Sequence, residues 1–115
     1  MGDLDGDGDV DMVALHSGRN SASVLLNDGD GTFSPAASYF AGDGSQSVAL
    51  GDLDGDGDVD MAVANAIDGI VSVLLNNGDG ALSRGEFCVV SRWSHLYCVA
   101  LGDLDGDGDT DMAVA

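Results

Sequence analysis

Aspartate recurs at alternate positions in three stretches of the chain, which read DLDGDGDVD from Asp3, DLDGDGDVD from Asp52 and DLDGDGDTD from Asp103. Each stretch holds five carboxylates with two glycines between them. At about 5 Å and an effective dielectric of about 20, each neighbouring pair of charges repels by roughly 3 kcal/mol. A folded loop therefore needs a counter-charge, and a hard cation bound through oxygen supplies it.

Calcium fits this pattern better than other common ions. It takes ~6–8 oxygen ligands in irregular geometry, whereas magnesium demands a strict octahedron and keeps its water. Zinc prefers nitrogen and sulfur, and the two histidines, His16 and His95, stand far from the loops. We expect Asp58 to contribute its backbone carbonyl, with its carboxylate turned to water. The sequence predicts up to three Ca²⁺ sites, with these metal-site residues: Asp3, Asp5, Asp7, Asp9, Asp11, Asp52, Asp54, Asp56, Asp58, Asp60, Asp103, Asp105, Asp107, Asp109 and Asp111.

The first six loop positions also match the EF-hand pattern D-x-[DN]-x-[DN]-G-x₅-E. The bidentate glutamate that closes an EF-hand is absent, because its position holds Ala14, Val63 or Val114. The segment DMAVA after the loop also has the character of a strand and not of a helix. The EF-hand is therefore excluded.

The loops resemble the D-x-D-x-D-G-x-x-D calcium loop of the FG-GAP/VCBS family, the β-propeller repeats of integrin α-subunits and many bacterial surface proteins. The resemblance extends to the lead-in SVALGD from Ser47 and to the following SVLLNDGDGTF and SVLLNNGDGAL segments. The Phe-Gly and Gly-Ala-Pro signatures are absent, which places the chain nearer the bacterial type. The resemblance implies a propeller fold and secreted or cell-surface relatives.

The spacing of the loops predicts the architecture. The loops begin 49 and 51 residues apart, a period typical of a propeller blade or a similar array. Between Gly51 and Leu101, short apolar segments separated by turn residues predict four strands: Met61–Asn65, Ile70–Asn76, roughly Glu86–Val90, and Leu96–Leu101. We expect an all-β fold of β-propeller-type blades, each of four antiparallel strands, with no substantial helix.

One repeat region covers residues 1–115, with units of about 2–50 and 51–101 and a truncated unit at 102–115. Closed propellers need ~4–8 blades, so the sequence predicts about two blades of an incomplete ring. Repeats need neighbours to bury their faces, so self-association is expected.

The net charge of −18 comes mainly from the loops, which hold 15 of the 20 aspartates. Without a basic patch the chain is a poor binder of nucleic acid or anionic membranes. It shows no signal peptide and no stretch for membrane insertion. Because millimolar calcium outside cells fills weak sites, we expect a parent protein that is extracellular or at the cell surface.

One segment, residues 84–97 (RGEFCVVSRWSHLY), departs from the repeat. It holds Arg92, the only Trp (Trp93), and Cys88, with Cys98 just beyond it. Two interpretations remain open: a specialised sugar- or protein-binding loop, or an altered hairpin with an ordinary core aromatic. A disulfide between Cys88 and Cys98 is open as well, because cross-strand geometry is demanding.

No catalytic set is evident, since the only glutamate is Glu86 and His16 is expected to be a strand-end or surface residue. We therefore expect no enzyme, but a calcium-binding scaffold that serves extracellular adhesion or binds a protein or glycan ligand through a complete propeller. The alternative is a non-catalytic fragment of a larger secreted enzyme that acts on polysaccharides.

Overall fold

Nine strands make up the regular structure of the described part of the chain, which comprises residues 2–16, 18–89 and 96–115 of this computed structural model. The strands run in chain order: β1 (Met12–His16), β2 (Ser21–Asn27), β3 (Phe33–Phe40), β4 (Ser45–Gly51), β5 (Asp60–Asn65), β6 (Ile70–Asn76), β7 (Leu82–Val89), β8 (Val99–Gly102) and β9 (Asp111–Val114). No helix among these residues is long and apolar enough to cross a membrane.

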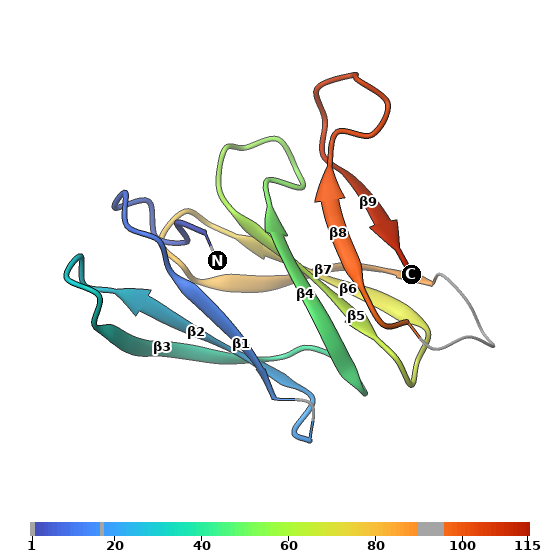
Figure 1. Cartoon of the computed structure of the whole chain (residues 1–115), viewed down its shortest axis with the longest axis horizontal. Coiled ribbons are helices and arrows are strands. Elements are labelled where there is room, and N and C mark those ends of the chain that lie inside the picture. Colours follow the sequence, from blue (N-terminus) through green and yellow to red (C-terminus); the bar gives the residue numbers. More distant parts are fainter. Residues whose placement is uncertain (1, 17, 90–95) are drawn as a thin grey trace.

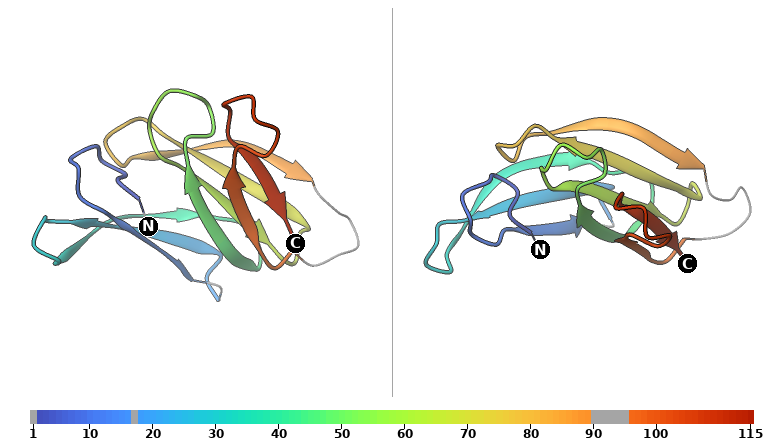
Figure 2. Two further views of the ribbon diagram at one scale, coloured as in Figure 1. Left: turned by 45° about the horizontal axis from the view of Figure 1, so that its top comes forward. Right: turned by 90° about the horizontal axis from the view of Figure 1, so that it is seen from above.

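The strands form three antiparallel sheets in the orders β1-β2-β3, β4-β5-β6-β7 and β8-β9. The middle sheet has four strands, the number expected for one blade, and the all-β prediction is confirmed. Figure 1 and Figure 2 show the sheets side by side, with the middle sheet between the other two. The aspartate loops lie along one edge of this array, at the top of Figure 1.

The boundaries of the sheets lie one strand earlier in the chain than the boundaries of the repeat units read from the sequence. Of the four strands predicted between Gly51 and Leu101, the last corresponds to β8, which pairs with β9 in the third sheet. Strand β4, which precedes the unit, begins the middle sheet instead. The reason is local: each aspartate loop is the connection of an antiparallel pair, so the strands before and after it share a sheet.

Two hydrophobic clusters fill the spaces on either side of the middle sheet. Because side chains alternate along a strand, β5 contributes to both of them. Met61 and Val63 pack with residues of the first sheet, and Ala62 and Ala64 pack toward the third. Every residue of β5 is buried. The strand that follows the middle loop is thus held on both faces.

The segment that departs from the repeat is described only in part. Residues 90–95, which include Arg92, Trp93 and His95, lie outside the described residues, as does the side chain of Cys88. The binding-loop interpretation therefore remains a prediction. Cys98 is an exposed, free thiol in the structure.

Candidate metal centre

The middle loop curls around its own first aspartate. Asp52 accepts hydrogen bonds from two backbone N–H groups, at 2.7 Å from Gly55 to Oδ1 and at 2.9 Å from Gly57 to Oδ2. Both glycines have positive φ angles, +81° and +92°, which residues with a Cβ rarely adopt. The glycines at these positions therefore allow the curl that turns the backbone around one carboxylate.

The last aspartate of the loop ties it to the sheet. Asp60 is fully buried. Its Oδ2 accepts a hydrogen bond from the N–H of Leu53 at 2.8 Å, and its Oδ1 accepts one from the N–H of Asn76 at 2.8 Å. Since Asn76 ends β6, this carboxylate links the start of the loop to a strand that follows it by 16 residues.

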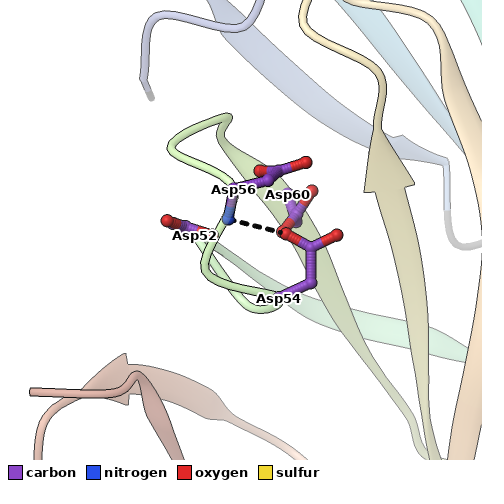
Figure 3. Close-up of side chains that lie close together, drawn as sticks. All are labelled: Asp52, Asp54, Asp56 and Asp60. Atoms are coloured by element: carbon purple, nitrogen blue, oxygen red, sulfur yellow. Dashed lines mark hydrogen bonds between the residues drawn. The ribbon is translucent and has the colours of Figure 1, made fainter.

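Four carboxylates of the middle loop converge. One oxygen each of Asp52, Asp54, Asp56 and Asp60 lies within 4.8 Å of the others. Figure 3 shows these side chains around the loop, with the Asp56 N–H donating to Asp54 Oδ1 at 3.2 Å. The third loop brings together the corresponding four residues, and the first loop brings together three: Asp103, Asp105, Asp107 and Asp111; Asp3, Asp5 and Asp11.

The seventh loop position behaves differently from the others. Asp9, Asp58 and Asp109 lie outside all three carboxylate groups, and so does Asp7 of the first loop. The carboxylate of Asp58 lies instead against the β6–β7 turn, with Oδ2 2.9 Å from where a Cβ on Gly78 would stand. The structure thus turns this carboxylate toward a neighbouring turn, whereas the sequence suggested water.

The electrostatics of the middle loop are unfavourable without a counter-charge. Partial loss of hydration raises the pKa of Asp54 above its ordinary value, and the charges of Asp60 and Asp56 add to the effect. Loss of hydration, followed by the charges of Asp56, Asp60 and Asp52, also raises the pKa of Asp58. The pKa of Asp52 is lowered, chiefly by the N–H of Gly57. Within the loop, Asp52 is therefore stabilised as an anion by the backbone, while Asp54 and Asp58 resist ionisation.

The donor set is suited to a hard divalent cation. Every grouped ligand atom is a carboxylate oxygen, and no histidine or cysteine among the described residues joins a group. Oxygen-only sets favour calcium, magnesium or manganese over zinc or copper. The same backbone bonds recur in the first loop, where Gly6 and Gly8 donate to Asp3 at 2.7 and 3.0 Å. They recur in the third loop as well.

A supporting residue was missed by the sequence reasoning. The side chain of Asn76 is buried and donates to the carbonyl oxygens of Leu4, at 2.6 Å, and Val59, at 3.0 Å. It thereby joins the first loop, the middle loop and the β6–β7 turn. The available signal was the asparagine that ends both SVLLN segments, at Asn27 and Asn76, one residue short of a Gly-Asp-Gly sequence.

Outside the aspartate loops, His16 is linked by hydrogen bonds to two serines. His16 is the exposed last residue of β1, as the sequence predicted, and its Nε2 shares a hydrogen bond with Ser23 Oγ at 2.8 Å. Ser23 in turn shares one with Ser38 Oγ at 2.8 Å. These three side chains lie on β1, β2 and β3.

Comparison with known proteins agrees with the repeat architecture. Comparison with curated proteins found no match to the chain. The FG-GAP-like repeat matches twice, over residues 3–63 and over residues 52–114. Each match begins on the first aspartate of a loop and ends on the strand after the next loop, so that the middle loop belongs to both. The antiparallel sheets are accordingly blades of the β-propeller type, and the chain belongs to the FG-GAP-like repeat family.

Proposed function

We propose that the chain is a calcium-binding scaffold whose aspartate loops hold structural Ca²⁺, up to one ion per loop. The observation that carries the proposal is the convergence of four carboxylates, one of them the buried Asp60, within 4.8 Å in the middle loop. A buried acid tied to β5 and β6 couples the loop to the sheet. Cation binding there adds to the free energy of unfolding.

Calcium is favoured over other hard cations by the character of the loop. The carboxylates come from a short, glycine-rich segment without the fixed octahedral arrangement that magnesium requires. The ion would be held by Asp52, Asp54, Asp56 and Asp60, and by the corresponding residues of the other loops. Its chemistry is charge neutralisation: three bound divalent cations would change the net charge from −18 to −12. Asp60 would keep its bonds to Leu53 and Asn76 while the exposed acids close on the ion.

The biological role that we propose is a scaffold for extracellular adhesion or ligand binding. Calcium is abundant outside cells, and sites made of exposed loop carboxylates suit millimolar affinities. The partner would be a protein or a glycan bound through a larger propeller surface. We propose no catalytic activity for this chain, because the acids that converge lie in the proposed cation sites.

The experiment is a set of thermal melts in calcium, in magnesium and in chelator. We expect calcium to raise the midpoint, magnesium to do so much less, and chelator to abolish the gain. Asp54→Ala should reduce the calcium-dependent gain. Asp79→Asn is the matched control, because Asp79 is an exposed acid outside the loops whose bond to the Ala81 N–H an amide retains. A thermal midpoint that calcium does not change, or that magnesium raises as much as calcium does, would refute the proposal.

A further inference from the structure

The first and second sheets contact each other near the aspartate loops, where Leu4 lies beneath the β6–β7 turn. We call this contact the joint. Leu4, the second residue of the first loop, is only 1 % exposed. Its carbonyl oxygen accepts the 2.6 Å hydrogen bond from Asn76, so it lies beneath the β6–β7 turn. Val59 of the middle loop packs against the same cluster from the second sheet. The β6–β7 turn of the second sheet thus covers Leu4 of the first sheet.

The turn and the loop fit closely at this joint. A Cβ placed on Gly80 would lie 3.7 Å from Asp5 Cβ and 3.8 Å from the Leu4 oxygen. A Cβ placed on Gly6 would lie 3.5 Å from the Gly78 oxygen. These are ordinary van der Waals distances, so the joint is packed without strain.

Both halves of this joint recur on the chain. The loop half recurs in the middle loop, where Leu53 is half-buried against the second cluster, and in the third loop, where no described residue covers it. In the third loop, Leu104 corresponds to Leu4 and is 65 % exposed, and Gly106 corresponds to Gly6 and has nothing within 4 Å of a Cβ position. We call the surface formed by Gly102, Leu104, Gly106 and the exposed Ala113 the tail face.

The first sheet carries the other half. The turn Asn27–Gly31 corresponds to Asn76–Gly80, and Gly31 is exposed with nothing within 4 Å of a Cβ position. Asn27 Nδ2 donates to the Val10 oxygen at 3.1 Å, as Asn76 does to Val59, but has no described counterpart of the bond to Leu4. Val10 itself is 50 % exposed. We call the surface formed by Val10, Met12 and the turn Asn27–Gly31 the head face.

We propose that two copies of this chain associate head to tail, with the head face of one copy packed on the tail face of the next. The occupant is a second copy because the chain carries both halves of a joint that it already forms internally, with nearly the same residues. In the complex Leu104 is covered by the turn Asn27–Gly31 of the other copy. Asn27 gains the Leu104 oxygen as its second acceptor.

The charges of the two copies oppose this association. Docking brings the third loop of one copy beside the first loop of the other, and each of these loops carries five aspartates. Calcium or high salt should therefore strengthen the complex. Because salt screens the repulsion without occupying the loops, the association can be tested even if the loops do not bind calcium. Such a head-to-tail contact also leaves a free face at each end, so it propagates unless a ring closes.

Sedimentation velocity over a range of concentrations tests the proposal, with one series in calcium and another in high salt with chelator. Leu104→Asp removes the tail face and Val10→Asp removes the head face. Each should weaken self-association on the order of tenfold or more, because a buried aliphatic contact is replaced by a charge. Ile67→Asp is the control, since Ile67 is 71 % exposed and lies outside both faces. It should associate like the unaltered chain.

Mixing the two disabled variants gives the decisive result. Leu104→Asp keeps its head face and Val10→Asp keeps its tail face, so together they should form a complex that stops at one copy of each. Circular dichroism melts establish that both variants fold. The proposal is overturned if the unaltered chain stays monomeric, if either variant alone associates normally, or if the mixture gives no complex. A face left to a following repeat of a longer chain would give the first of these results.

Discussion

The loops Asp52–Asp60 and Asp103–Asp111 differ at a single residue, Val59 against Thr110. Their backbones make the same internal hydrogen bonds, and four carboxylates converge in each. Their surroundings differ. The closing acid of the middle loop is buried and accepts bonds from Leu53 and Asn76. Among the described residues, Asp111 accepts only the bond from Leu104, at 2.9 Å, and it is half-buried.

Local sequence therefore sets the hydrogen bonds within the loop, whereas the neighbouring strands of the sheet hold the last aspartate of the loop in place. In the middle blade, β6 supplies the second N–H to Asp60 and packs the loop against the neighbouring blade. The first loop shares this anchor, since Asp11 accepts bonds from Leu4 and from Asn27 at 2.7 and 2.9 Å. A loop anchored at both ends is better preorganised for cation binding.

The largest expected effect is on stability without any cation. Asp60→Ala leaves two N–H groups at the middle loop without their acceptor and should lower the free energy of unfolding by about 2–5 kcal/mol. Asp111→Ala removes one exposed bond and should cost about 1 kcal/mol or less. Urea denaturation in chelator measures both, and Asp60→Asn, which keeps one acceptor oxygen, is the control. Equal losses at the two sites would mean that the anchor in β6 does not matter.

Calcium affinity should follow the same order. We expect the middle site to bind about tenfold more tightly than the third, because Asp60 accepts hydrogen bonds from both Leu53 and Asn76, whereas Asp111 accepts only one, from Leu104, among the described residues. Titration calorimetry compares Asp54→Ala, which leaves the first and third sites, with Asp105→Ala, which leaves the first and middle sites. The first site is common to both variants, so the difference between them reports the two affinities. Indistinguishable binding constants would show that the loop sequence alone sets the affinity.

Within the middle loop, the converging acids should matter more than the seventh one. Asp54→Ala or Asp56→Ala should weaken calcium binding on the order of tenfold or more, because each removes a ligand oxygen. Asp58→Ala should have a smaller effect, since its carboxylate lies against Gly78 and outside the group. Thermal midpoints at fixed calcium rank the three variants. A larger loss for Asp58→Ala would assign its carboxylate to the ion.

The smallest effect is a dependence on pH in the absence of cation. Asp5, Asp54 and Asp58 have raised pKa values in the folded chain, so their contribution to stability is present below the ordinary value and is lost as the pH rises through the folded value. Asp52 acts in the opposite sense because its pKa is lowered: its contribution is lost as the pH falls through the folded value. Asp30 acts in the same sense as Asp52, because hydrogen bonds from Thr32 lower its pKa. With three acids against two, acidification from neutral to just above the ordinary pKa near 4 should raise the melting midpoint slightly in chelator.

Calcium should reverse this behaviour. Protons compete with the ion for the same oxygens, so the calcium-dependent gain in midpoint should shrink over the same range of pH. Melts at several pH values, with calcium and with chelator, give both curves. A midpoint that falls on acidification in chelator would contradict the assignment of the raised pKa values.

Strand positions were predictable where the pattern is local. The sequence placed Ile70–Asn76 at the bounds of β6, and β5 begins only one residue before the predicted Met61. Strand β7 was expected from Glu86 but begins at Leu82, because the turn closes at the Asn77 N–H to Ala81 oxygen bond and pairing resumes at once. Strand β8 begins at Val99, three residues later than expected.

By itself, the sequence determined the internal hydrogen bonds of the loops: the alternation of aspartate and glycine sets which backbone N–H groups the first aspartate accepts. It also determined the repeat and the all-β character, since both follow from spacing and short-range pattern. Only the tertiary structure decided which closing acid is anchored and which leucine is covered. Asn76 and Leu4 are 72 residues apart, and they meet only because the second sheet packs on the first. Packing of that kind depends on neighbouring blades, and so identical loop sequences end in different surroundings.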